Sequence, residues 1–207
     1  TIHVSTDDQI DFKVAGSDKL VISSTSHLVT TTAGTNNFVL GLNAGNSIQS
    51  GGVQNVALGD EAGTAITTGD NNICIGYQAG DAISTGDNNI AIGKNALGAE
   101  DGHDFNIAIG SNALAVQDVG GNSFNIAIGH NAGTSISTGT VNTLIGYLAG
   151  DAITTGNNNV AIGHEALGAE IQGDQNVAVG VGALQSQSNS TDVNAQNTAV
   201  GYNAGLS

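Results

Sequence analysis

Short alternations of large apolar and small residues recur through most of the chain. Residues 89–93 read Asn-Ile-Ala-Ile-Gly, so that two isoleucines flank one alanine and a glycine ends the run. Because successive side chains of a strand point to opposite faces, this pattern predicts a short β-strand with isoleucine on one face and alanine on the other. The glycine predicts a bend after the strand, where the backbone needs positive φ or a close approach.

This pattern occurs ten times between residues 37 and 201. Each copy begins with Asn and ends with Gly, and an Ala follows three residues after the glycine. Successive glycines are 17 residues apart in most steps and 18, 19 or 21 apart in the others. A nearly fixed period of this length indicates one structural unit that stacks on copies of itself. The glycines are Gly41, Gly59, Gly76, Gly93, Gly110, Gly129, Gly146, Gly163, Gly180 and Gly201.

A coil of about 17 residues with two short extended segments can stack on the next coil at the strand spacing of about 4.8 Å. We therefore expect an all-β chain in which residues 34–207 form a parallel β-solenoid of ten turns. Ten turns would make a rod on the order of 45–50 Å long. Asparagines that stack from turn to turn are expected to form hydrogen-bonded ladders. The repeat positions expected to carry the structure include Asn72, Gly76, Ala79, Asn89, Gly93, Ala96, Asn106, Gly110 and Ala113.

A longer period lies above the short one. Residues 77–97 and 147–167 are closely similar and lie 70 residues apart, which corresponds to four turns. The residue after the recurrent alanine is Gly in some turns and Leu in the others. We interpret this as duplication of a four-turn block. A second interpretation is that the two kinds of turn shape alternating surface features.

Residues 3–29 follow a different pattern. Apolar and polar residues alternate in residues 10–14 and again in residues 20–22, and residues 15–18, Ala-Gly-Ser-Asp, lie between these runs. This arrangement is typical of a β-hairpin. We expect residues 1–33 to form a small β-strand connector that joins the solenoid to whatever precedes it.

A thin solenoid with apolar side chains on both faces of its strands has two faces that need burial. One face fills the interior of the coil. We expect the other, the alanine face, to pack against neighbouring chains, because small side chains permit close approach. Association of three copies along a common axis would meet this need and help to protect the sheet edges. The sequence therefore predicts a homotrimer.

Composition excludes some functions. The formal net charge is −15, with three lysines and no arginine, so the chain cannot neutralise phosphates as a nucleic-acid partner must. Binding to an anionic membrane through a basic patch is excluded for the same reason. Cys74 is the single cysteine, so no intrachain disulfide is possible. It stands where other turns have Ala, and we expect a small buried residue.

Candidate chemistry is sparse. The acidic residues lie mostly in predicted loops and several recur with the repeat, which is typical of turns rather than of a catalytic pair. The histidines are scattered without a His-x-His pair, although a symmetric trimer could place one ligand from each copy around an axial ion. We therefore expect no enzymatic activity, no cofactor and no metal site within one chain. The loop acids are Asp70, Asp81, Asp87, Asp101, Asp104, Asp151 and Asp174, and the histidines are His3, His27, His103, His130 and His164.

The position after each bend glycine varies most from turn to turn, which indicates exposure. The large residues at this position are candidate receptor contacts, and packing against the next turn is the alternative interpretation. Loops 98–104, 115–124 and 185–196 are further candidates, because loops on a rigid scaffold often carry binding. The candidate contacts are Tyr77, Lys94, His130, Tyr147, His164 and Tyr202.

The unit Asn-Ile-Ala-Ile-Gly-x-x-Ala, as in residues 89–96 and 106–113, resembles the head repeat of trimeric autotransporter adhesins. The resemblance covers residues 34–207 at the level of the motif and implies a left-handed parallel β-roll that trimerises. The period is longer than the family's usual one, because loops such as Thr-Gly-Asp-Asn-Asn add residues. No stalk or membrane anchor of the adhesin kind is recognised in this sequence.

Residues 10–13 and 19–22 are similar instead to segments of bacteriophage tail-fibre proteins, which also carry runs of this repeat. This resemblance implies a shaft or receptor-binding segment of a phage tail fibre, located outside the host cell on the virion. The implied partners are further copies of the chain, a host surface glycan or protein receptor, and other tail proteins. Two alternatives stay open, a trimeric cell-surface adhesin head and an ice-binding or other extracellular structural solenoid.

Overall fold

The structure is a computed structural model that describes residues 2–4, 10–14, 17–22, 28–29, 33–99, 101–118, 121–189, 191 and 193–206. Side chains are described from residue 33 onward, apart from that of Val193. Every regular element within these residues is a β-strand. The prediction of an all-β chain is therefore confirmed.

The first four strands form one antiparallel sheet in chain order. They are β1 (Ile2–Val4), β2 (Ile10–Val14), β3 (Ser17–Ile22) and β4 (Leu28–Val29). β2 and β3 are the antiparallel pair that the alternation predicts, and their register shifts between Phe12 and Lys13. The loops that join these strands, and His27, lie outside the described residues.

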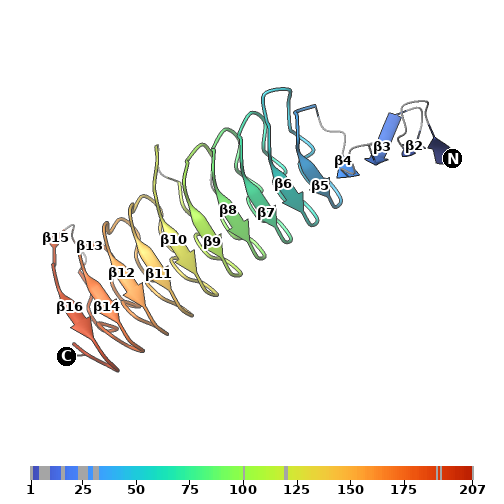
Figure 1. Cartoon of the computed structure of the whole chain (residues 1–207). Helices are drawn as coiled ribbons and strands as arrows, with labels where there is room; N and C mark the ends of the chain where they lie inside the picture. Colours follow the sequence, from blue (N-terminus) through green and yellow to red (C-terminus); the bar gives the residue numbers. More distant parts are fainter. Residues whose placement is uncertain are drawn as a thin grey trace.

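The rest of the chain is a parallel β-solenoid. Ten three-residue strands form a single sheet in chain order, each paired in register with the strand one turn away. Figure 1 shows these strands following one another along a rod. A second, two-stranded parallel sheet pairs β13 (Gly173–Asp174) with β15 (Val193–Asn194) near the C-terminal end. The ten strands are β5 (Phe38–Leu40), β6 (Val56–Leu58), β7 (Ile73–Ile75), β8 (Ile90–Ile92), β9 (Ile107–Ile109), β10 (Ile126–Ile128), β11 (Thr143–Ile145), β12 (Val160–Ile162), β14 (Val177–Val179) and β16 (Thr198–Val200).

The faces of these strands are oriented opposite to the expectation. In eight of the ten strands, from β6 to β14, the central residue, such as Ala57 or Ala91, points into the coil and is fully buried. The flanking isoleucines point outward and stay partly exposed. The other side of the coil supplies Ala62 and Ile66 to the same core, so the space opposite most strands takes a small side chain, whereas in β11 it holds Leu144. The expected packing of the alanine face against neighbouring chains is therefore wrong, and the isoleucine face is the one left uncovered.

Buried asparagines connect each turn to the next. The side-chain oxygen of Asn72 accepts the backbone N–H of Asn89 at 2.9 Å, and that of Asn89 accepts the N–H of Asn106 at 2.9 Å. The side-chain amide of Asn89 also donates to the carbonyl of His103, 14 residues further on, at 2.6 Å. The same arrangement recurs at Asn55 and in later turns. The predicted ladder is confirmed, and it satisfies polar groups that would be costly to bury unpaired.

The two kinds of turn are two ways of filling the same interior. In an Ala-Gly turn, a Cβ atom added at Gly63 would lie 2.8 Å from Cδ1 of Ile66, so the two positions cannot both carry large side chains. In an Ala-Leu turn, Leu114 occupies this space, and the residue three positions later is the buried, polar Gln117. Glu170 takes the place of Gln117 in another such turn. The Gly-to-Leu change along the sequence is thus coupled to an Ile-to-polar change in the core.

The asparagine ladder yields the first prediction. In Asn89→Ala, the backbone N–H of Asn106 and the carbonyl of His103 each lose a buried partner. Because an unsatisfied buried group costs about 1–3 kcal/mol, we expect a loss of about 3 kcal/mol of unfolding free energy, measured by chemical denaturation. The matched control Asn122→Ala lies in an exposed loop and should change stability by less than about 0.5 kcal/mol. Equal effects of the two substitutions would contradict a structural role for the ladder.

Candidate functional site

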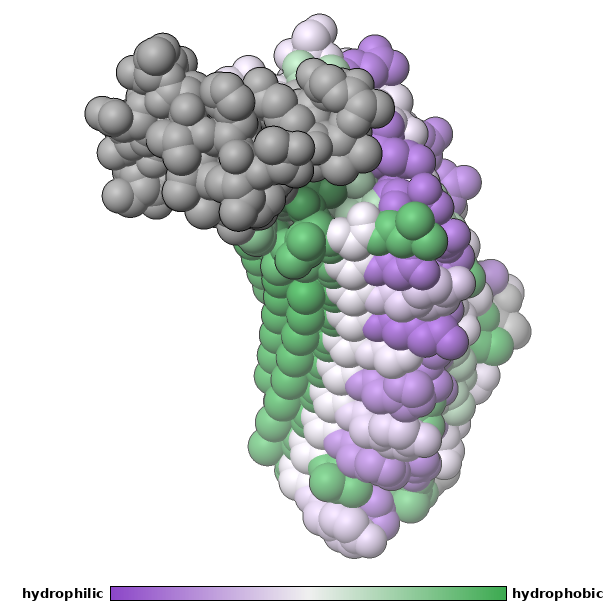
Figure 2. All heavy atoms as spheres, turned by 90° about the vertical axis from the view of Figure 1, so that its right-hand side faces the viewer, coloured by the Kyte–Doolittle hydropathy of each residue, from purple (hydrophilic) through white to green (hydrophobic). Residues whose placement is uncertain are grey.

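The outward side chains of the ten strands form two parallel rows, which we call the apolar stripe. Nine strand spacings of about 4.8 Å make it about 43 Å long. Figure 2 shows it as a continuous hydrophobic band along the rod. Contiguous apolar surface of this extent is uncommon on a monomeric protein. The rows are Phe38, Val56, Ile73, Ile90, Ile107, Ile126, Thr143, Val160, Val177 and Thr198, and Leu40, Leu58, Ile75, Ile92, Ile109, Ile128, Ile145, Ile162, Val179 and Val200.

One edge of the stripe is formed by the bend glycines. Gly76 and Gly93 adopt φ of 127°, and a Cβ atom on Gly76 would lie 2.9 Å from the carbonyl carbon of Gly93 in the next turn. No side chain fits in this column, so the backbone of successive turns lies in close contact. The residue after each glycine forms the next row, which we call the bend row, and Figure 2 shows it beside the glycine column.

The structure places all six candidate receptor contacts in the bend row, and all six are exposed. It brings three of them together, because the ring of Tyr147 stacks between those of His130 and His164 at centroid distances of 5.6 and 5.1 Å. Lys94 Nζ lies 6.0 Å from the ring centroid of Tyr77. Tyr202 belongs to the last turn and is the most exposed of the tyrosines. The stacked rings cover one another's faces, so this row presents ring edges to its surroundings.

The opposite edge of the stripe contains a feature that the sequence analysis missed. The residue before each ladder asparagine has positive φ, and in most turns it is Asn or Gln. We call these positions the corner row. In three consecutive turns the corner row instead carries Phe105, Phe124 and Val141, which are 45%, 49% and 49% exposed. The rings of Phe105 and Phe124 stack at 5.4 Å. In the sequence, the signal for this feature is an apolar residue directly before the repeated Asn, where the other turns have Asn or Gln.

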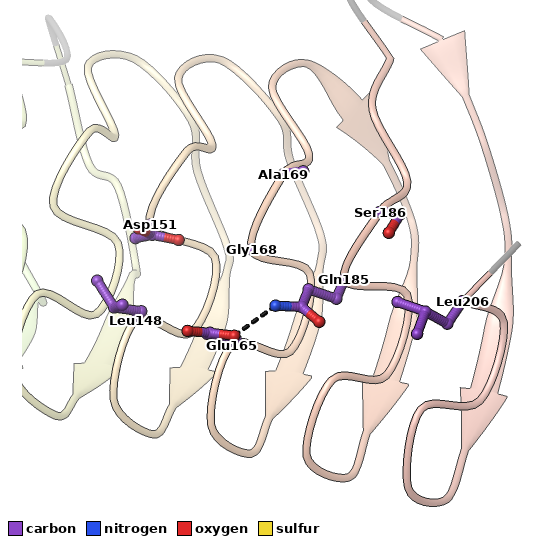
Figure 3. A pocket seen from close by; sticks show the side chains of 8 residues that line it. All are labelled: Leu148, Asp151, Glu165, Gly168, Ala169, Gln185, Ser186 and Leu206. Carbon is purple, nitrogen blue, oxygen red and sulfur yellow. Dashed lines mark hydrogen bonds between the residues drawn. The ribbon is translucent and has the colours of Figure 1, made fainter.

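A shallow groove lies near the C-terminal end, with a volume of about 710 Å³. Figure 3 shows Asp151 and Glu165 on its wall, with the side-chain amide of Gln185 directed at the Glu165 carboxylate, to which it donates a hydrogen bond. The pKa of Asp151 is raised, mainly because the side chain is partly buried. A hydrogen bond from its own backbone opposes this effect, and the negative charge of Glu165 adds to it. Leu148 and Leu206 complete the apolar part of the lining.

Glu170 is a fully buried carboxylate. It accepts hydrogen bonds from the backbone N–H groups of Ile171, Gly173 and Asn189 and from the side-chain amides of Asn189 and Gln187. Burial alone would raise the pKa of Glu170, but these hydrogen bonds outweigh it and hold the pKa below its usual range. Glu170 therefore ties the start of the long loop 185–196 to the core.

The other candidates for chemistry have structural partners. Asp70, Asp87 and Asp104 each accept a backbone N–H from the preceding turn at 2.7–2.8 Å, in agreement with the predicted turn chemistry. Cys74 is fully buried as expected, and burial, together with the charge of Asp81, raises the pKa of its thiol to about 12. His103 is buried beneath its loop.

Within the part of the chain that the structure describes, no group of three or more His, Cys, Asp or Glu side chains is placed to hold a metal ion. That same part contains no helix long and apolar enough to cross a membrane. Comparison of the chain with protein families, curated proteins and solved structures finds no match.

Glu170 generates a pH prediction. A carboxylate whose pKa is lowered on folding stabilises the fold above its unfolded pKa, and this stabilisation is lost as the pH falls through the folded value. We expect Glu170→Gln to lower the unfolding free energy by about 1–3 kcal/mol at pH 7, because amide hydrogens then face the donors. The difference from the unsubstituted protein should shrink toward pH 3. Denaturation at both pH values measures it, and the exposed Asp118→Asn is the control. A loss that is equal at both pH values would contradict this role.

Proposed function

We propose that this chain forms the shaft or receptor-binding segment of a phage tail fibre and works as a homotrimer that attaches the particle to the host surface. The observation that carries the proposal is the apolar stripe, whose side chains are partly or fully exposed in every strand from β5 to β16. Such a surface needs a partner of matching length and spacing. A second copy of this chain has both.

The distribution of charge supports self-association through the stripe. The chain carries a formal net charge of −15, so copies repel one another over most of their surface. The stripe contains no charged residue, and the two threonines in it are its only hydroxyl-bearing residues. Contact between copies is therefore least opposed along the stripe. Three thin coils can direct their stripes toward a common axis and bury them together.

The asparagine ladder and the in-register sheet support a mechanical role. Each turn is connected to the next by strand pairing and by the asparagine ladder. Hydrogen bonds from the Thr-rich loops add to these connections; for example, Thr67 Oγ1 donates to the carbonyl of Ser84 at 3.0 Å. Such a rod transmits force along its length and offers few unpaired backbone groups to proteases. The N-terminal segments that resemble tail-fibre proteins favour a phage fibre over a cellular adhesin.

The trimer is tested by a charge placed in the stripe. Ile109→Lys puts one ammonium group from each copy at the proposed axis, while the outward position leaves the coil interior intact. We expect the unsubstituted chain to sediment as a trimer and Ile109→Lys as a folded monomer, because an unpaired buried charge costs several kcal/mol. Thr68→Lys, on an exposed loop away from the strands, should remain trimeric. An unsubstituted chain that sediments as a monomer would remove the trimer from the proposal.

Attachment is tested separately with the folded protein. Fluorescently labelled protein should bind to some strains of a bacterial panel and not to others, with surface glycan extracts or protease treatment of the cells identifying the receptor class. Tyr77→Ala probes the bend row outside the ring cluster of His130, Tyr147 and His164, and we expect it to lower receptor binding at least tenfold. A trimer that binds no cell in the panel, encoded away from tail genes, would contradict host attachment.

A further inference from the structure

The apolar stripe alone does not define how far along the axis one copy sits relative to the next. Most turns present Ile, Val or Leu at both stripe positions. A slide by one turn, about 4.8 Å, therefore replaces each contact by a closely similar one and loses only the last turn. A repetitive surface of this kind specifies register weakly, and a unique assembly needs features that do not repeat.

The corner row supplies such a feature at Phe105, Phe124 and Val141. Exposure alternates along residues 105–109 as exposed, buried, partly exposed, buried and partly exposed, so Phe105 lies on the same side as Ile107 and Ile109. The same alternation holds in the next two turns. These three side chains widen the apolar stripe by one row at β9, β10 and β11 and nowhere else in the described solenoid.

These residues are unfavourable for an isolated coil. Their φ values are 64°, 52° and 60°, in the left-handed region that suits Gly and Asn and that strains a β-branched residue such as Val141. Other turns place Asn at the corner row, as at Asn71 and Asn88, which lowers the backbone cost and suits contact with water. Stacking between the phenylalanines leaves each ring about half exposed. Burial of these side chains against another chain would offset this cost.

We propose that Phe105, Phe124 and Val141, which we call the register patch, pack against a second copy of this chain and set the axial register of the assembly. The proposal rests on the homotrimer proposed above. In a ring of three identical copies, each contact joins one edge of a copy to the opposite edge of its neighbour. The opposite edge is the bend row, which in the turns of β10 and β11 carries the stacked rings of His130 and Tyr147. Stacked rings thus occupy the corner row at β9 and β10 and the bend row at β10, β11 and β12, so the ring contacts between the two edges change with the axial offset of neighbouring copies.

The test replaces both rings with the residue that other turns use. Phe105→Asn/Phe124→Asn should fold at least as well as the unsubstituted chain, because Asn suits the left-handed backbone. If the rings are buried between copies, the same variant should weaken trimer formation at least tenfold in sedimentation across a concentration series. Gln54→Asn, in the same row outside the patch, is the control and should leave the assembly unchanged. A variant trimer as stable as the control would overturn the inference.

The axial register between copies can be measured by interchain disulfide formation between cysteines placed away from the register patch. Gln175→Cys is combined in three separate proteins with Val181→Cys, with His164→Cys one turn before, or with Tyr202→Cys one turn after. Gln175 and Val181 lie at the two ends of one strand, about 20 Å apart, too far for an intrachain disulfide. With the patch intact, one of the three proteins should form most of the interchain disulfide. With Phe105→Asn/Phe124→Asn added, the yield should spread over all three.

The two failures are distinguishable. A monomeric unsubstituted chain overturns the trimer and the register patch together. A stable trimer whose cross-linking pattern is the same with and without the two phenylalanines overturns the patch alone and leaves the proposed function standing.

Discussion

The narrow interior of the coil is the constraint on which the rest of the structure depends. Opposite most strands there is space only for a small side chain, because Ala62 and Ile66, or their equivalents, fill the interior from the other side, and only β5 and β11 place the larger Val39 and Leu144 there. Alanine therefore points inward, and the isoleucines on either side of it lie on the outer face of the strand. A single coil cannot bury both faces of its own strands, and the uncovered stripe follows from the small diameter of the turn.

The same constraint explains the polar residues of the core. A thin coil places much of its backbone at corners, where strand pairing does not reach, and the asparagine ladder satisfies those groups. Where a leucine enters the interior, as at Leu114, isoleucine no longer fits, and Gln117 takes its place with hydrogen bonds to Ser123 and Asn125. In such a turn, a buried polar side chain with hydrogen bonds replaces the packing of an isoleucine.

Period, strand positions and the asparagine ladder could be predicted from the sequence because each of them repeats. The direction of the strand faces could not, because an Ile-Ala-Ile alternation is the same whichever side faces inward. Only the volume supplied by Ile66 from the far side of the coil decides it, and that contact depends on the fold. The bend row was predicted to be exposed from its variation, and it is. The corner row could not be predicted from the motif, because it lies one residue before the repeated Asn, and only the structure shows that Phe105, Phe124 and Val141 replace amides in a stacked row.

Repetition gives this chain a long apolar face, and it also makes each stretch of that face closely similar to the next. The departures from the repeat therefore carry more of the specificity than the repeat does. Phe124 and His130 flank the same strand, β10, and each is stacked with a ring in a neighbouring turn. A side chain that costs backbone strain, is half exposed and breaks an otherwise polar row is hard to explain within one chain. It is readily explained if the functional unit is several chains held at one height.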